Sequence, residues 1–281
     1  MVNRLLAVHA HPDDESISMG GTLAHYAATG AWVSLVTCTL GEVGEVIPTE
    51  LRGLAADAAD QLGGYRHVEL IRACRALGVA DHRYLGEIGR YRDSGMVGTA
   101  AALHPRALVQ ARPGTAGFAA AVAELTAVID EVRPQVVVSY DADGGYGHPD
   151  HIVAHQIARA AATASPAVRR FFAVIRPESA VRHALDHFDT APGYLRPLAS
   201  DLGFATTSER VAVRVPTLDY RDAQRRALAA HATQIDVLPS GFALSNRIAQ
   251  PLLDAEYFAL LDGEPLPVGA TPAADLFAGL T

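Results

Sequence analysis

Residues 4–15 read RLLAVHAHPDDE, an apolar run followed at once by histidines, a proline and three acidic residues. The apolar part, residues 5–9, predicts a buried strand. Residues 135–151 repeat the arrangement with QVVVSY, a glycine-rich DADGGYG and then HPDH. Ligands bind at the carboxyl ends of the strands in an open parallel sheet. The two stretches therefore predict an α/β fold in which two loops rich in His and Asp meet at one sheet edge.

Between these stretches β-rich runs alternate with helical ones, which is typical of a Rossmann-like, mostly parallel sheet flanked by helices. Further strands are predicted at residues 32–39, 83–85, 135–140, 171–175 and 211–215. Helices are predicted at 22–29, 49–62 (ending at Gly63-Gly64), 68–77, 118–132, from near His148, 179–188 and 218–234. We expect residues 1–165 to form a metal-binding catalytic core. Residues 166–281 are expected to form a smaller, irregular α+β part of the same compact unit that completes the substrate pocket.

Composition excludes several classes of protein. With 281 residues, 49% of them hydrophobic and 19% charged, the chain is not intrinsically disordered. Its 23 basic residues are outnumbered by 31 acidic ones and are scattered, which argues against a nucleic-acid partner. No run approaches the roughly 18 apolar residues of a membrane span, and none suits a signal peptide. The two cysteines are too few for a disulfide framework, so we expect a cytoplasmic protein.

Histidine is the unusual residue, with 12 in the chain, and imidazole is the commonest metal ligand. His11 and Asp14 lie three residues apart across a proline turn, so both can reach one point. His151, at the start of a later helix, supplies a third ligand. An N/N/O set of three protein ligands leaves a position open for water or substrate, as in catalytic zinc sites. We predict one Zn²⁺ per subunit, and the same donors also suit Fe²⁺.

Three neighbours of these ligands are candidates for the chemistry. Asp13 diverges from Asp14, so its carboxylate is free to take a proton from metal-bound water. His148 lies one helical turn before His151 and can face the same cavity. Asp150 is expected to hold His148 in its tautomer and to favour its charged form. The simpler interpretation makes Asp14 a helix N-cap and His148 a surface residue, but two such loops favour the catalytic one. His9 is expected to support the first turn, and histidines such as His231 have no assigned role.

AHPDDE after the first strand and GHPDH after a later one resemble the PIG-L/LmbE-like family of zinc deacetylases, which remove the N-acetyl group from N-acetylglucosamine conjugates. Further blocks resemble the mycothiol-pathway branch of this family, which acts on N-acetylglucosaminyl-inositol. These blocks are TCTLGEVGEV (37–46), DQLGGYR (60–66), YLG…GRYRDSGM (84–96), LAAHATQ (228–234) and ALSN (243–246). Together they span nearly the whole chain.

The resemblance implies hydrolysis of N-acetylglucosaminyl-inositol, a small amino-sugar conjugate, to glucosaminyl-inositol and acetate. It implies zinc ligation by His11, Asp14 and His151, and Asp13 as the general base. Groups at the tetrahedral intermediate would be Tyr146 and His148, with Asp150 behind His148. Positions matching the sugar site are Glu45, Arg66, Asp93 and Met96. The simpler interpretation makes Arg66 a surface ion-pair partner and Asp93 a turn residue.

Ser18 bears on the closest rival, a mycothiol S-conjugate amidase, which typically has a lysine shortly after the HPDDES turn. We place Ser18 among the substrate-facing residues, and its presence favours the deacetylase. A PIG-L-type deacetylase of another N-acetylglucosamine conjugate stays open. Residues 98–116 and 164–210 depart from the family pattern, so no substrate wall is assigned there. The oligomeric state is also left open, a homo-oligomer included.

Two functions of other classes fit the same residues less well. An Fe²⁺ oxygenase with a facial triad also uses two histidines and a carboxylate. It typically presents HxD on a barrel strand, however, whereas this chain has HxxD after a parallel strand. A sugar-binding or metal-sensing module would need neither Asp13 nor His148.

Overall fold

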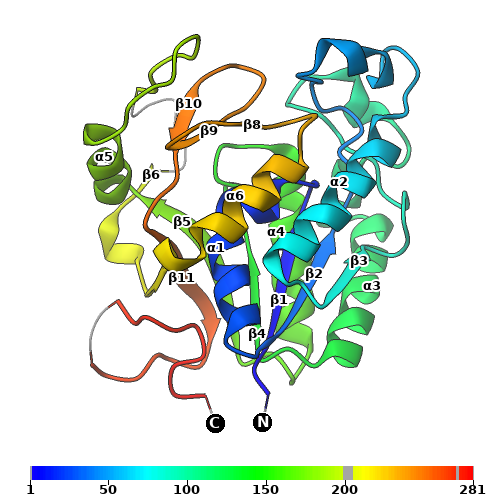
Figure 1. Ribbon diagram of the computed structural model, residues 1–281. Coiled ribbons are helices and arrows are strands. Elements are labelled where there is room, and N and C mark those ends of the chain that lie inside the picture. Colours follow the sequence, from blue (N-terminus) through cyan, green and yellow to red (C-terminus); the bar gives the residue numbers. More distant parts are fainter. Residues whose placement is uncertain (1, 199–204, 270–271, 281) are drawn as a thin grey trace.

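The main sheet follows the strand order β3-β2-β1-β4-β5-β11-β7, with β6 beside β5 (Figure 1). The computed structural model describes residues 2–198, 205–269 and 272–280. The strands are β1 (Arg4–His9), β2 (Trp32–Thr37), β3 (Asp81–Tyr84), β4 (Val136–Ser139), β5 (Arg170–Pro177), β6 (Ala205–Thr206), β7 (Val213–Pro216) and β11 (Ala255–Gly263). Strands β1 to β5 pair in parallel, whereas β11 runs antiparallel to β5 and β7. The predicted α/β fold with a mostly parallel sheet is confirmed.

The strand order reverses next to β1, which lies between β2 and β4. The chain runs from β1 outward to β2 and β3, and then returns to β4 on the other side of β1. Such a reversal opens a crevice at the carboxyl ends of the two strands. His9, the last residue of β1, pairs with Thr37 of β2, and Ala7 pairs with Val138 of β4. The loops that follow β1, β2 and β4 therefore leave the sheet at the same edge.

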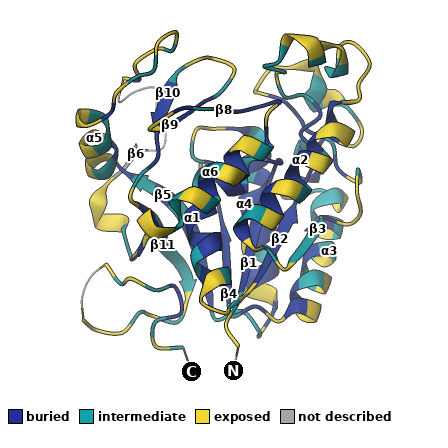
Figure 2. Cartoon of the chain, in the orientation of Figure 1, coloured by how far each residue is buried: buried dark blue, intermediate teal, exposed yellow. Residues whose placement is uncertain are grey.

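Helices cover both faces of the sheet (Figure 1). Helices α1 (Asp14–Ala28), α2 (Leu62–Leu77) and α6 (Arg221–Ala230) contact one another on one face, and α3 (Ala116–Val132) contacts α4 (Pro149–Ala164) on the other. Leu5 and Leu6 of β1 are fully buried and belong to different cores, one on each side of the sheet. Figure 2 shows the buried strands between helices whose outer sides are exposed. Both faces of β1 to β4 are thus covered, as in other parallel sheets.

The C-terminal part adds helix α5 and a small antiparallel sheet of order β10-β9-β8. Their bounds are α5 (Glu178–Asp186), β8 (Asp236–Val237), β9 (Gly241–Ala243) and β10 (Ala249–Pro251). Short 3-10 helices lie at Thr49–Leu54, Ala100–Leu103, Leu108–Ala111, Ser208–Arg210 and Leu218–Tyr220. Within the variable region 164–210, residues 199–204 lie outside the described residues.

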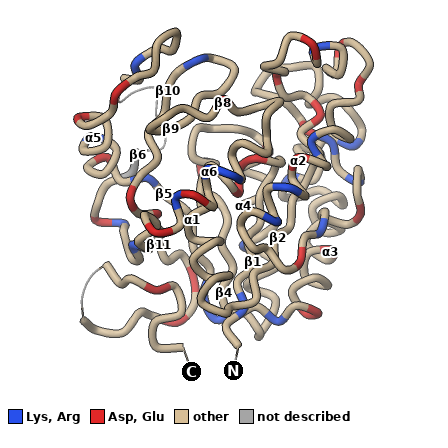
Figure 3. Tube along the Cα trace, viewed as in Figure 1, with Lys and Arg blue, Asp and Glu red and all other residues tan. Residues whose placement is uncertain are grey.

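Figure 3 shows acidic and basic residues interspersed over the helices and loops. No helix in the described part of the chain has both the length and the apolarity of a membrane-spanning segment.

The predicted helix at 49–62 was wrong. The structure has a 3-10 helix at Thr49–Leu54, and α2 begins only at Leu62 and runs through Gly63-Gly64. A Cβ atom on Gly63 would lie 2.8 Å from the Glu42 side chain and 2.9 Å from that of Leu40. This glycine therefore lets the loop after β2 pack against α2 instead of ending a helix.

Two further helices differ from prediction in length, and the sequence did not predict β6, β8, β9, β10 or β11. Helix α1 begins at Asp14 and is kinked at Met19, so it starts well before the segment 22–29 that the sequence assigned to this helix. Helix α6 ends at Ala230, four residues earlier than predicted, because the His231 carbonyl accepts the N–H groups of Gln234 and Ile235. Strand β11 was not predicted, although it joins β5 to β7.

Candidate active site

A cavity of about 570 Å³ opens at the carboxyl edge of β1 and β4. Every residue that the sequence predicted for the site lines this cavity, except Asp150. These lining residues are His11, Asp13, Asp14, Ser18, Glu45, Arg66, Asp93, Met96, Tyr146, His148 and His151. Asp150 is fully buried and contacts the ring of His11. The far wall comes from the part expected to complete the pocket, but its residues were not singled out in the sequence; they include Arg176 of β5, Gln234, Leu244 and Gln250.

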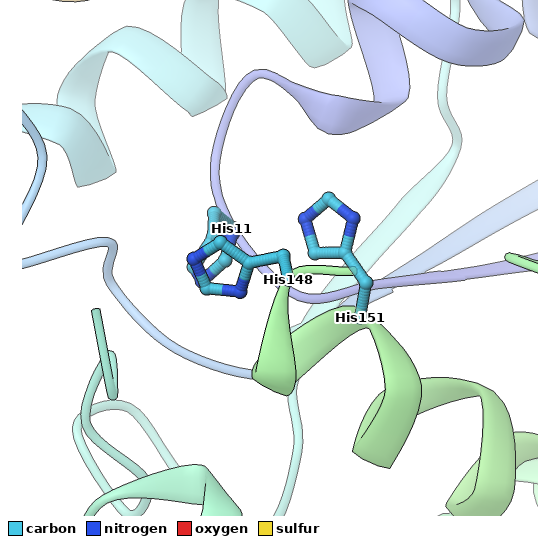
Figure 4. Close-up of side chains that lie close together, drawn as sticks. All are labelled: His11, His148 and His151. Carbon is cyan, nitrogen blue, oxygen red and sulfur yellow. The ribbon is translucent and has the colours of Figure 1, made fainter. Parts of the chain in front are cut away.

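Three histidine rings meet in this cavity (Figure 4). His11 comes from the turn after β1, while His148 is the N-cap of α4 and His151 lies in its first turn. Each ring offers a nitrogen within 4.8 Å of the other two. Positions three apart at a helix start lie on one side of the helix, which explains why His148 and His151 both face His11. The predicted convergence of the two loops is therefore present.

The Asp14 carboxylate lies between two of these rings. Its Oδ2 is 3.3 Å from His11 Nδ1 and 3.4 Å from His151 Nε2. The Tyr140 hydroxyl and the His11 backbone N–H both donate to this oxygen, at 2.7 and 3.0 Å. The Tyr140 ring also stacks on His151, with centroids 4.0 Å apart. Tyr140, which ends the QVVVSY run, thus supports two predicted ligands, and sequence reasoning did not single it out.

This donor set fits a divalent metal ion. His151 Nδ1 lies 3.1 Å from the Gly144 carbonyl and donates to it, which leaves the lone pair on Nε2. That Nε2 atom is buried and has no hydrogen-bond partner among the described residues. His11 Nε2 lies 3.2 Å from Asp150 Oδ2, so its Nδ1 is the atom left on the Asp14 side. A carboxylate behind a histidine fixes the tautomer in this way in many metal sites. Two imidazole nitrogens and a carboxylate therefore face one point, as in catalytic zinc sites.

The electrostatics of the cluster also favour a cation. Burial by itself lowers the pKa of His11, but the carboxylates of Asp93, Asp14 and Asp150 raise it well above its usual value. Burial opposes ionisation of Asp14, yet His151 and His11 hold the pKa of this carboxyl well below its usual range. The buried carboxylates thus favour positive charge at the centre of the cluster, and a bound divalent ion supplies such charge.

Asp13 is held in an unusual conformation beside this cluster. It is the N-cap of α1, yet its side chain makes no capping hydrogen bond, and its backbone has φ 117 and ψ −31. Its Oδ2 instead accepts a hydrogen bond from Arg66 Nη2 at 3.0 Å. Burial raises the pKa of Asp13 to about 6, although the Arg66 guanidinium opposes this rise. A carboxylate with such a pKa suits proton acceptance near neutral pH.

Arg66 is buried, so its interpretation as a surface ion-pair partner was wrong. The side chain is only 3% exposed. Besides Asp13, it donates to the carbonyls of Gly41 and Pro12. Arg66 therefore joins the loop after β2 to the turn after β1.

The expected role of Asp150 is corrected by the structure. Its carboxylate does not reach His148: Oδ2 lies beside His11 and accepts the Ser94 N–H at 2.9 Å. Only the backbone N–H of Asp150 contacts His148, donating to Nδ1 at 3.1 Å. The neutral His148 ring therefore carries its proton on Nε2. Burial, together with His11 and His151, lowers the pKa of His148 to about 3, so Asp150 does not favour its charged form.

The remaining predicted residues form the rim and the side wall. Asp93 accepts the N–H groups of Gly95 and Val43 at 2.8 and 3.2 Å, so it is both a turn residue and a link to the loop after β2. Met96 and Tyr146 lie at the rim and are 47% and 45% exposed, and Glu45 is exposed as well. Ser18 donates its hydroxyl to the Asp14 carbonyl at 2.5 Å.

Two buried residues beneath the turn were missed by sequence reasoning. Glu15 and His231 are both fully buried, and His231 Nε2 lies 2.8 Å from Glu15 Oε1. Each residue lies in a quoted block, Glu15 in AHPDDE and His231 in LAAHATQ. The charge pattern of the sequence nevertheless gives no reason to join two residues so far apart.

Comparison with known proteins gives a consistent result. Residues 6–162 match the PIG-L family, described as GlcNAc-PI de-N-acetylase. A 1D-myo-inositol 2-acetamido-2-deoxy-alpha-D-glucopyranoside deacetylase of Nakamurella multipartita is 54% identical over 281 residues, which cover 99% of this chain and 96% of the relative.

Solved structures share the fold at low identity. The zinc inhibited form of the teicoplanin deacetylase Orf2 matches with a TM-score of 0.55 at 20% identity, over 93% of this chain and 100% of that one. The 4-carboxy-2-hydroxymuconate hydratase GalB of Pseudomonas putida matches with a TM-score of 0.59 at 15% identity, over 96% and 100%. A deacetylase and a hydratase thus share this fold, so the fold alone does not determine the reaction.

Proposed function

The chain belongs to the PIG-L family of de-N-acetylases, and from this we propose that it hydrolyses the N-acetyl group of N-acetylglucosaminyl-inositol to give glucosaminyl-inositol and acetate. The substrate is supported by the identity to the Nakamurella relative over nearly the full length of both chains. The chemistry is supported by one observation of the site: Asp13 is turned away from its helix cap and lines the cavity that also holds the N/N/O donor set.

We propose that His11, Asp14 and His151 hold one Zn²⁺ per subunit, with Fe²⁺ as the rival ion that the same donors accept. When bound, such an ion lowers the pKa of water and polarises a carbonyl. The buried, unpaired Cys38 and Cys74 are typical of a reducing compartment, and we place the reaction in the cytoplasm.

Asp13, Tyr146 and His148 have separate roles in the proposed amide hydrolysis. Asp13, oriented by Arg66, accepts one proton from water as the water oxygen bonds to the acetyl carbon. Tyr146 donates its hydroxyl hydrogen bond to the oxygen that becomes negative, as donors of an oxyanion site do. His148 donates a hydrogen bond through Nε2–H to the amide nitrogen as the C–N bond breaks and keeps its proton. Asp13 gives the proton that it took from water to the departing amine, and the acetic acid formed releases the second water proton to become acetate.

Polar groups at the rim and side wall select the substrate. Asp93, Glu45 and Arg66 face a ligand rich in hydroxyl groups, and Ser18 and Met96 lie beside them. A cavity with such groups rejects ligands that leave them unpaired.

Acetate release tests the proposal directly. Metal-free protein is reconstituted with Zn²⁺ or with Fe²⁺ and assayed for acetate release from N-acetylglucosaminyl-inositol and, in parallel, for release of glucosaminyl-inositol from a bimane conjugate of mycothiol. We expect metal-dependent acetate release with the higher kcat/KM on the first substrate. A higher kcat/KM on the conjugate would make the protein an amidase, and no turnover of either compound would refute both functions.

A further inference from the structure

We propose that His231 is a positioning residue for Asp13 and that it acts through the buried carboxylate of Glu15. The proposal rests on the deacetylase function argued above, because it concerns the general base of that reaction. It assigns a role to a residue that does not line the cavity and lies at the end of α6, far from Asp13 in the sequence.

The backbone of Asp13 requires an external restraint. A φ of 117 is strained for a residue with a side chain, and such strain persists only where the surroundings hold it. An Asp at a helix N-cap ordinarily has extended backbone angles, and its side chain accepts an N–H group of its own helix. Asp13 does neither. If the restraint were lost, Asp13 could relax to an ordinary N-cap, and its carboxylate would turn from the cavity to the helix.

Glu15 supplies this restraint. Its Oε2 accepts the backbone N–H of Asp13 at 2.9 Å, while its Oε1 accepts the Ser16 hydroxyl at 2.5 Å and His231 Nε2 at 2.8 Å. The carboxylate is fully buried, so each of these bonds replaces one that water would make. The orientation of the Glu15 carboxylate therefore determines where the Asp13 N–H points.

His231 fixes that orientation. The ring is fully buried, and its Nδ1 has no hydrogen-bond partner among the described residues, so Nε2 is the nitrogen that donates to Glu15. The residue itself is held at the C-cap of α6, where its carbonyl accepts the N–H groups of Gln234 and Ile235, each at 2.9 Å.

The segment after His231 also contacts α2, the helix that carries the side-chain partner of Asp13. Thr233 donates to Glu69 of α2 through its N–H at 2.8 Å and its hydroxyl at 2.7 Å. Glu69 lies one helical turn after Arg66, which donates to Asp13 Oδ2. The end of α6 thus fixes both the backbone partner of Asp13 and the helix that carries its side-chain partner.

Two substitutions at His231 separate positioning from packing. His231→Leu keeps much of the volume but removes the donor to Glu15. His231→Gln removes the ring but offers an amide N–H in place of Nε2–H. Leu77→Ala is the matched control for lost stability, because Leu77 is 1% exposed in the core at the far end of α2 and does not line the cavity.

Each variant is measured for kcat and KM of acetate release, for bound metal by elemental analysis, for melting temperature and for the Asp13 φ angle in a crystal structure. We expect His231→Leu to lower kcat about 10- to 100-fold, the loss typical of removing a supporting partner of an active-site group. KM and metal content are expected to stay unchanged, with φ of Asp13 leaving the positive range. We expect His231→Gln to recover most of the lost kcat, and Leu77→Ala to lower the melting temperature with kcat retained.

An unchanged kcat in His231→Leu, or an Asp13 φ still near the wild-type value, would overturn the positioning role. A kcat loss in Leu77→Ala equal to that in His231→Leu would reduce the effect to lost stability and also overturn it. Wild-type protein that releases no acetate would instead refute the proposed function. In that case the φ angle of Asp13 in His231→Leu still decides whether His231 holds this backbone.

Discussion

Replacing Asp13 by Asn separates proton acceptance from the other properties of this residue. Asn keeps the volume of Asp and an oxygen that accepts the Arg66 hydrogen bond, which is 3.0 Å long in the structure. Asn also tolerates positive φ better than most residues, so the backbone at φ 117 is retained. Only the basic carboxylate is lost. We expect the variant to fold and to bind metal as the wild type does, because Asp13 is not in the proposed ligand set.

The expected loss of turnover follows from what surrounds Asp13. A positioned general base contributes about 10²- to 10⁴-fold, or roughly 3–5 kcal/mol of transition-state stabilisation. The neighbouring carboxylates cannot replace it, because Asp14 is engaged by two imidazoles and Asp93 by two backbone N–H groups. We therefore expect kcat to fall about 10³-fold or more. Arg66 loses a charged partner but keeps two carbonyl acceptors, while the cost of burying the Asp13 carboxylate, which raises its pKa to about 6, is removed. We therefore expect little change in the free energy of unfolding.

The assay measures kcat and KM of acetate release, metal by elemental analysis, and unfolding in urea. Asp60→Asn is a matched control, because Asp60 also has positive φ, at 53, and pairs with an arginine, but does not line the cavity. Asp13→Asn with kcat within about threefold of the wild type would refute the assignment of the base. Loss of metal from this variant would also contradict the reasoning, since it would place Asp13 among the ligands.

Three further predictions concern the metal, the pH dependence of stability and the loop after β2. His11→Ala is expected to lose bound metal and activity together, and elemental analysis showing full occupancy would contradict this. Burial raises the pKa of Glu256 from 4.5 to about 7, although backbone N–H groups and Arg176 oppose the rise. The native state therefore keeps a proton that the unfolded chain releases, and the free energy of unfolding should fall by about 3 kcal/mol as pH rises from 4.5 to 7. Urea titrations at several pH values should show this fall in the wild type but not in Glu256→Gln. The same dependence of the unfolding free energy on pH in both proteins would contradict the prediction. In Gly41→Ala, a Cβ 2.1 Å from Arg66 Nη1 at a backbone φ of +64 should displace Arg66, so we expect a lower melting temperature and a lower kcat.

The sheet and the histidine cluster could be predicted because their signals are local. Residues 5–9 and 135–140 are short apolar runs, and each is followed at once by the side chains that matter. Parallel strands with helical crossovers end at one edge, so His11 and His151 were expected near each other before their strands were known to be neighbours. The periodicity of α3, and the glycine that ends α2, are local signals of the same kind.

The rest depends on contacts that no local pattern encodes. The bond between Glu15 and His231 joins residues 216 positions apart, and it forms only because α6 packs against α1. Periodicity shows that His231 ends an amphipathic helix and nothing about the residue it meets. Strand β11 was missed for the same reason. Its partners β5 and β7 lie far before it in the sequence, and no hairpin turn joins it to either of them. Gly63 was misjudged because its packing against Leu40 is visible only in three dimensions.

The error over Asp150 shows how the two motifs depend on each other. Asp150 is adjacent to His151 and close to His148 in sequence, so its carboxylate was expected to serve a histidine of its own motif. At the start of α4, the rings of His148 and His151 face His11. The Asp150 carboxylate also reaches the ring of His11, in the other motif, and not that of His148. The carboxylate that fixes the tautomer of one proposed metal ligand is thus supplied by the motif after β4, and the imidazole that it orients by the motif after β1. Register between β1 and β4 is therefore a condition for the proposed metal site, and a sequence with only one of the two motifs would lack both a ligand and the group that orients one.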